Sequence, residues 1–181
     1  YILDKSNLKI IDIEMNDING GSFAVTAAKK DSKHAQNTAV INWMLEEEEK
    51  MGLKTEKPYR QFAQRVQEHR TSLISLLDKL KNNGKKLIGY GASTKGNVLL
   101  QYCNIGTQYL DCIAEVNEQK FGSYTPGTLI PIVSEAEAKA MKPDYLFVLP
   151  WHFKNNILGR EKEYRAVGGK FIFPLPFIEI V

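Results

Sequence analysis

A glycine-rich segment near the middle of the chain constrains the fold more than any other feature. Residues 85–101 read KKLIGYGASTKGNVLLQ, which is a short apolar run, a turn of small residues and a helical pattern. In this strand–turn–helix arrangement a phosphate lies close to the backbone, because the N–H groups and the positive dipole end of the helix face it. Two hydroxyl donors and a lysine add to the attraction for an anion. The residues that we expect at the anion are Gly89, Gly91, Ala92, Ser93, Thr94 and Lys95.

The turn matches neither of the two standard phosphate-binding motifs. A dinucleotide fingerprint that begins at Gly89 requires glycine at position 94, where this chain has Thr94. A phosphate loop of the NTPase kind requires Gly-Lys followed by Ser or Thr, whereas here Lys95 precedes Gly96. Two interpretations therefore stay open at this point: an anion-binding turn, and a tight strand–helix turn whose glycines serve only packing.

The segment before the turn has a different organisation. Residues 8–14 and 22–28 read as two strands joined by a turn-rich stretch, which predicts a β-hairpin. A helix is expected over 37–51 and a longer one over 58–82, which ends before Gly84. The apolar residues that predict one buried stripe on the longer helix are Phe62, Val66, Leu73, Leu76, Leu77 and Leu80.

From residue 85 onward, strand and helix patterns alternate, which favours a parallel sheet with helices on both faces. The expected strands are 86–90, 110–115, 130–133, 145–148 and 170–173, and the expected helices are near 96–104, 134–141 and 153–166. The fold class is therefore α/β: a Rossmann-like, doubly wound, mostly parallel sheet, preceded by a β-hairpin and two helices.

Two domains are expected. A lone hairpin is marginally stable, and the chain opens at Tyr1 rather than Met. We therefore interpret residues 1–57 as the edge of a truncated upstream domain, and residues 58–181 as a Rossmann-like domain with its leading long helix.

The strand ends supply further candidate site residues, since ligands of open α/β sheets lie beyond the carboxyl ends of the strands. Glu115 lies 24 positions after Gly91, near the place where an acid holds ribose hydroxyls, although a surface acid explains it equally well. Asn117 and Lys120 begin a polar loop of about a dozen residues, a length typical of functional loops. Lys120 is placed to face a diphosphate.

Two more candidates follow the strand at 145–148. Trp151 either stacks on a base or sugar, or simply covers the sheet edge. His152 is a weak candidate for a general base, because no nucleophile and no orienting carboxylate is evident beside it.

Composition excludes several classes of function. The net charge of +3 is too small, and its basic residues too mixed with acids, to indicate nucleic-acid binding. No apolar run approaches the roughly 20 residues of a membrane span. The histidines are scattered and the two cysteines, Cys103 and Cys112, lack metal-ligand spacing, so we predict no metal site and a cytoplasmic location with reduced thiols.

Several motifs in the same order resemble one known family, the C-terminal domain of SAM-dependent sugar C-methyltransferases that act on nucleotide-linked deoxysugars. The motifs are GGSFAV at 20–25, GYGASTKG at 89–96, YTPGTLIPI at 124–132, PDYL at 143–146, LPWHF at 149–153 and GGKFIFPLP at 168–176. The resemblance covers nearly the whole chain.

The resemblance implies a division of labour. Family members carry an N-terminal zinc-binding domain, a middle SAM-binding domain and a C-terminal domain that helps to hold the nucleotide-diphosphate sugar. It implies that residues 91–95 cradle the diphosphate and that Asn117, Lys120, Trp151 and His152 lie near the nucleotide or sugar. SAM and the catalytic base would be held upstream, so these residues alone are expected to be inactive.

The residues themselves leave two other functions possible. One is a free-standing NAD(P)-dependent oxidoreductase, which Thr94 in the fingerprint argues against. The other is a non-catalytic scaffold domain with an empty Rossmann shell, which would bind no ligand at the turn.

Overall fold

The computed structural model describes the backbone of residues 1–181 and every side chain but that of Asn19. The chain divides into two compact units, Tyr1–Val66 and Gln67–Val181. No described helix is both long enough and apolar enough to cross a membrane.

The first unit contains the predicted hairpin. Its elements are α1 (Ile2–Lys5), β1 (Leu8–Asn16), η1 (Ile18–Gly20), β2 (Ser22–Lys29), α2 (Thr38–Lys50) and the start of α3 (Lys57–Asn82). Strands β1 and β2 pair antiparallel from Leu8–Lys29 to Asn16–Ser22, with a bulge between Ile10 and Asp12. The predicted hairpin and both predicted helices of this region are confirmed.

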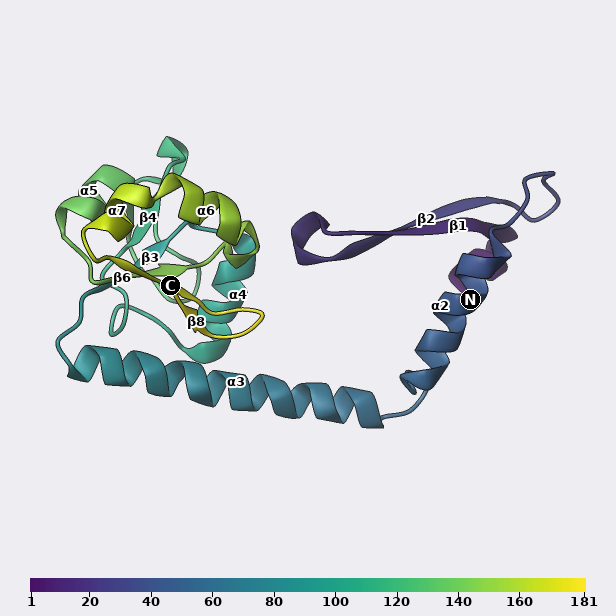
Figure 1. Cartoon of the computed structure of the whole chain (residues 1–181), viewed down its shortest axis with the longest axis horizontal. Coiled ribbons are helices and arrows are strands. Elements are labelled where there is room, and N and C mark those ends of the chain that lie inside the picture. Colours follow the sequence, from purple (N-terminus) through teal and green to yellow (C-terminus); the bar gives the residue numbers. More distant parts are fainter. The chain divides into compact units, whose positions relative to one another are not determined.

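The second unit is built on a six-stranded sheet (Figure 1). Its strands are β3 (Leu87–Tyr90), β4 (Ile113–Glu115), β5 (Ile132–Ser134), β6 (Tyr145–Val148), β7 (Lys170–Phe173) and β8 (Glu179–Ile180). Their order is β5-β4-β3-β6-β7-β8, in which β3 to β7 run parallel and β8 pairs antiparallel with β7. The five predicted strands are confirmed, and β8 is an additional strand.

The strand order contains a reversal. The chain passes from β3 to β4 and β5 on one side, and then returns to β6 on the other side of β3. Such a reversal opens a crevice beyond the carboxyl ends of the two flanking strands. In this protein the crevice lies at the ends of β3 and β6, where the glycine-rich turn and residues 149–153 follow the strands.

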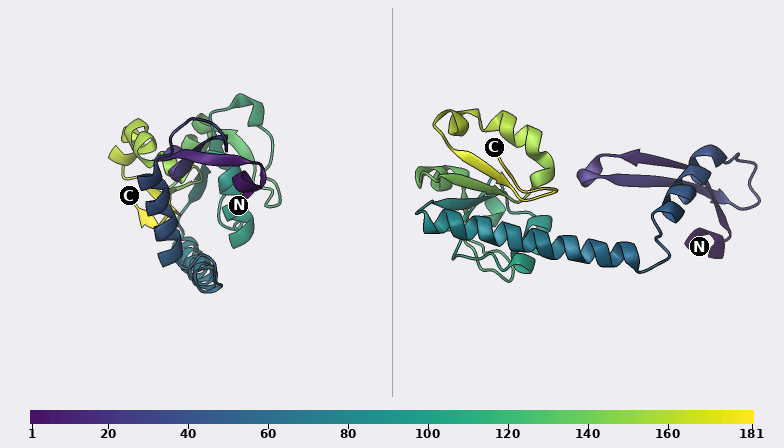
Figure 2. Two further views of the ribbon diagram at one scale, coloured as in Figure 1. Left: turned by 90° about the vertical axis from the view of Figure 1, so that its right-hand side faces the viewer. Right: turned by 60° about the horizontal axis from the view of Figure 1, so that its bottom comes forward.

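Helices cover both faces of this sheet, as the doubly wound prediction requires (Figure 2). The remaining helices are α4 (Thr94–Cys103), η2 (Glu118–Lys120), α5 (Glu135–Ala140), η3 (Trp151–Phe153), α6 (Lys154–Arg160) and α7 (Lys162–Ala166). Helices α3 and α4 bury their apolar residues against one face, and α5, α6 and α7 pack on the other. The fold is therefore α/β and Rossmann-like.

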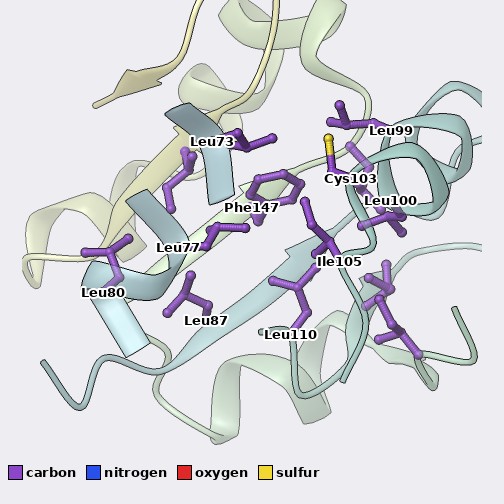
Figure 3. Packing of buried hydrophobic residues seen from close by; sticks show 14 of the residues in the cluster. Leu73, Leu77, Leu80, Leu87, Leu99, Leu100, Cys103, Ile105, Leu110 and Phe147 are labelled. Carbon is purple, nitrogen blue, oxygen red and sulfur yellow. The ribbon is translucent and has the colours of Figure 1, made fainter. Parts of the chain in front are cut away.

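The core on the α3 side explains how the long helix is held. Leu73, Leu77 and Leu80 follow one another at helical spacing and are buried against strand residues such as Leu87 and Phe147 (Figure 3). Full burial of one leucine side chain stabilises a fold by about 2 kcal/mol. Phe62, by contrast, is 60% exposed, so the predicted stripe is wrong at its N-terminal end.

The expected helix over 153–166 is interrupted at Glu161. Its backbone, with φ −96° and ψ 36°, leaves the helical region and separates α6 from α7. The carboxylate of Glu161 is buried and accepts hydrogen bonds from Tyr90 on β3 and Lys139 on α5. Partners from two distant elements therefore outweigh the local helical pattern.

The outer edges of the sheet are bordered by the chain itself. Strand β8 pairs with β7 at one edge. At the other edge, Ile132 of β5 accepts from Gly122 N at 3.0 Å and donates to Ser123 O at 2.9 Å. The loop that runs from residue 117 to 131 is thus ordered, and its Thr125 is buried.

Candidate functional site

The glycine-rich turn begins where β3 ends. Gly91 adopts a φ of +79°, a conformation that residues with side chains rarely take. Ser93 is extended and is the N-cap of α4, where its Oγ accepts a hydrogen bond from Gly96 N at 3.0 Å. The ten-residue helix α4 therefore begins a few residues after the carboxyl end of β3.

The glycines of this turn have distinct packing roles. A Cβ on Gly91 would lie 2.8 Å from Pro150 Cγ, and one on Gly96 would lie 2.5 Å from Leu149 Cβ. In a dinucleotide fingerprint the first glycine makes the tight turn and the third allows the helix to pack closely on the sheet. Gly91 and Gly96 meet these two requirements, so the fingerprint reads Gly-x-Ser-x-x-Gly from Gly91 to Gly96.

Gly89 lies outside that fingerprint. It is within β3, and a Cβ there would lie 2.1 Å from Ile113 Cδ1 on the neighbouring strand. The packing interpretation therefore accounts for Gly89, while Ser93 occupies the position at which a fingerprint glycine brings backbone close to a pyrophosphate. An anion at this helix end would meet a hydroxyl that still has its proton to donate.

Glu115 connects the turn to the end of β4. Its side chain is buried, and its Oε2 accepts from Ala92 N at 3.0 Å. Oε1 accepts from Val116 N at 2.8 Å and Asn117 N at 3.0 Å. Burial alone would raise the pKa of this carboxyl, but hydrogen bonds from Asn117 N, Lys120 and Val116 N outweigh it and lower the pKa. Glu115 is thus held as a carboxylate.

Lys120 and Asn117 continue this connection. Lys120 Nζ donates to Ala92 O at 2.8 Å and to Glu115 Oε2 at 3.1 Å. Asn117 caps η2, since its Oδ1 accepts from Gln119 N at 3.1 Å. Asn117 therefore shapes the loop, whereas Lys120 lies beside the turn.

A pocket of about 380 Å³ opens at this place, beyond the carboxyl ends of β3, β4 and β6. The sequence-predicted residues that line it are Gly91, Ala92, Ser93, Glu115 and Lys120. The other lining residues are Tyr90, Val116, Glu135, Pro150, Phe153, Asn156, Ile157 and Arg160. The predicted residues that do not line it are Gly89, Thr94, Lys95, Asn117, Trp151 and His152.

The sequence reasoning missed the wall that α6 supplies. Phe153 ends η3, and Asn156, Ile157 and Arg160 follow it on α6. Asn156 and Arg160 are four positions apart and Ile157 and Arg160 three, so these α6 residues share one helical face. The α6 residues do not follow a strand directly, so the positions of strand ends do not indicate them, whereas their helical spacing does.

A charged network forms the far end of this wall. Tyr90 OH donates to Glu161 Oε1 at 2.8 Å, and Arg160 donates to Tyr90 OH and to Glu135. Lys139 pairs with Glu161 at 2.7 Å. Burial raises the pKa of Tyr90, so its phenol remains protonated and donates its hydrogen bond to Glu161.

His152 lies outside the pocket, on η3. Its Nδ1 is buried and has no hydrogen-bond partner among the described residues. Burial and the nearby charge of Lys95 lower the pKa of this imidazole, so it is neutral at pH 7. No group of three or more His, Cys, Asp or Glu in the described part of the chain is arranged to hold a metal ion.

Comparisons with known proteins give a consistent result. Residues 17–176 match the family model of the C-methyltransferase C-terminal domain. The chain is also 36% identical over 175 residues to the C-methyltransferase NovU of Streptomyces niveus, across 97% of this chain and 41% of that relative. The chain thus spans about two fifths of the relative's length. Together these matches confirm the resemblance seen in the motifs, and the chain belongs to the C-methyltransferase C-terminal domain family.

Proposed function

We propose that residues 58–181 form the domain that binds the nucleotide-diphosphate sugar in a SAM-dependent sugar C-methyltransferase. The observation that carries this proposal is the pocket of about 380 Å³ at the point where the strand order reverses. Open α/β sheets bind their ligands at such points, and nucleotides are common among those ligands. Membership of a C-methyltransferase family supplies the reaction to which the ligand belongs.

The diphosphate would lie at the start of α4. The first N–H groups of a helix have no acceptor within it, and the helix dipole favours an anion there. Ser93 lines the pocket at this point, and Thr94 and Lys95 begin the helix with exposed side chains. Lys120 Nζ donates two of its three N–H groups within the chain, so the third can donate to the diphosphate.

The base would lie between two exposed apolar side chains. Val116 follows β4 and is 60% exposed, while Phe153 follows β6 and is 52% exposed. These strands flank β3, so the two residues lie on either side of the glycine-rich turn. The amide of Asn156 on the same wall offers a donor and an acceptor to the edge of a heterocycle.

The sugar would extend from the diphosphate toward Trp151 and His152, the remaining residues of the same sheet edge. In the intact enzyme, SAM bound outside these residues would supply the methyl group. A base, also outside these residues, would remove the proton from the sugar carbon, next to a keto group, that receives the methyl. The residues described here would hold the substrate without turning it over, in a cytoplasmic enzyme whose Cys103 and Cys112 are free thiols.

Calorimetry of the chain with dTDP, UDP and GDP tests the proposal, with SAM, NAD(H) and NADP(H) as controls. We expect saturable binding of at least one nucleoside diphosphate and none of the controls. Lys95→Ala should weaken that binding about tenfold, because a charge-assisted contact to phosphate is removed. The matched control is Lys170→Ala, since Lys170 begins β7 at the opposite end of the strands. Binding of SAM or NAD(H) in place of the nucleotides would refute the assignment.

A further inference from the structure

The carboxylate of Glu115 has its hydrogen-bonding capacity filled from within the chain. Oε2 accepts from Ala92 N and Lys120 Nζ, and Oε1 accepts from Val116 N and Asn117 N. These four bonds range from 2.8 to 3.1 Å. A carboxylate offers about four lone-pair sites, so each of them has a partner.

Because its lone-pair sites are filled, Glu115 is not free to accept a hydrogen bond from a ribose hydroxyl. In dinucleotide-binding folds, an acid about 20 residues after the glycine-rich turn accepts hydrogen bonds from the ribose hydroxyls. Glu115 stands at that place, at the end of the strand next to β3. A ribose hydroxyl would have to displace one of its present donors, and three of these are backbone N–H groups that would lose their acceptor. The side chain is also only 7% exposed.

The same bonds tie three segments together. Ala92 belongs to the glycine-rich turn, Val116 and Asn117 to the loop after β4, and Lys120 to η2. Ala92 is held at both its polar atoms, because its N–H donates to Glu115 and its carbonyl accepts from Lys120 at 2.8 Å. We call these five residues, Ala92, Glu115, Val116, Asn117 and Lys120, the Glu115 clamp.

We propose that Glu115 is a positioning residue that fixes the glycine-rich turn through this clamp and does not contact the ribose. The site therefore accepts 2′-deoxyribose and ribose nucleotides alike, a specificity that rests on the proposed nucleotide-binding function. Lys120 neutralises the carboxylate, so that an anion can lie beside it.

Amide hydrogen exchange of the ligand-free chain tests the clamp without any nucleotide. In the wild type, the amides of Ala92, Val116 and Asn117 should exchange at least tenfold more slowly than in Glu115→Gln. Glu118→Gln, a neighbouring exposed position on η2, is the matched control and should leave the three amides protected. Amides of β6 report on the stability of the whole sheet and should not change. Equal exchange of the three amides in wild type and Glu115→Gln would overturn the clamp.

Calorimetry with UDP and dUDP, which differ only at the 2′ position, tests the specificity. We expect dissociation constants within about threefold of each other, and equal weakening of both in Glu115→Gln. A preference for UDP of tenfold or more, lost in Glu115→Gln, would show that Glu115 reads the ribose and overturn the proposal. If neither nucleotide binds, GDP and dGDP, and then the ribose and 2′-deoxyribose forms of TDP, replace the pair. Binding of none of them would refute the proposed function, and with it the specificity, while the clamp is decided by the exchange measurement alone.

Discussion

Position 96 requires glycine because a side chain there would clash with its neighbours, not because of its backbone conformation. Its Cβ would approach Leu149 Cβ to 2.5 Å, and the two atoms belong to a helix and a strand end that are both packed in the core. Gly159, on α6, is also helical but has open space where a Cβ would lie. A substitution to alanine therefore creates a steric clash at position 96 and none at position 159.

We expect Gly96→Ala to lower the free energy of unfolding by about 1–3 kcal/mol, because it overpacks a filled interface. Gly159→Ala should raise it by about 0.5–1 kcal/mol, because alanine loses less backbone entropy on folding. Urea denaturation of the two variants measures both values. Destabilisation of the same size at both positions would contradict a specific contact at Gly96.

The glycine-rich turn shows which features of single residues could be predicted from the sequence and which could not. The glycine-rich turn itself was predictable, because an apolar run, small residues and a helical pattern follow one another. Which glycine makes the turn was not, since the choice depends on the φ of Gly91 and on the contact of Gly96 with Leu149. Likewise, the position of Glu115 was predictable, but its four internal donors come from segments that only folding brings together.

At the scale of secondary-structure elements, α4 and α5 begin with equivalent N-caps. Ser93 Oγ accepts from Gly96 N at 3.0 Å, and Ser134 Oγ accepts from Glu137 N at 3.1 Å. Only the first of these serines lines the pocket. The pair thus separates the stabilising effect of a cap from an effect on ligand binding.

Ser93→Ala and Ser134→Ala should each lower the free energy of unfolding by about 1 kcal/mol, the usual value of a serine cap. Only Ser93→Ala should also weaken nucleoside diphosphate binding, because it removes a hydroxyl donor at the phosphate. Thermal denaturation and calorimetry of both variants give the comparison. If Ser134→Ala weakened binding to the same extent, the effect of Ser93 would be attributable to stability alone.

The elements also show where sequence patterns fail. The parallel strands were predictable because they are buried on both faces and read as apolar runs. Strand β8 was not, since it is two residues long and follows two prolines at 174 and 176. The helix over 153–166 was predicted as one element, and the buried partners of Glu161 break it. In the second case, side chains from other elements, which no local stretch of sequence contains, decide the outcome.

At the scale of the whole molecule, burial is distributed unequally along the chain. Among the described residues before position 67, Ile41, at 8% exposure, is the only buried apolar residue. Both apolar clusters belong to the unit from Gln67 to Val181. The second unit therefore contains the interactions that a stable domain needs.

We expect a chain of residues 58–181, which keeps α3 nearly whole, to unfold cooperatively and to bind nucleoside diphosphates as the longer chain does. Residues 1–57 alone should show no cooperative transition, because one buried apolar residue cannot offset the entropy of ordering the chain. Calorimetric scans and circular dichroism of the two pieces provide the measurement. An unfolded 58–181 piece would contradict the proposed domain boundary.

The borders of the six-stranded sheet determine how this unit can meet other molecules. Open strand edges are the usual starting points for aggregation, because their unpaired N–H and C=O groups accept a strand from another chain. Here the loop around Ser123 occupies the outer side of β5, and the opposite border is β8, which is only two residues long. The sheet, as described, has no long edge on which a foreign strand can align. Through this unit, other proteins are therefore more readily met by the loops and helices than by an added strand.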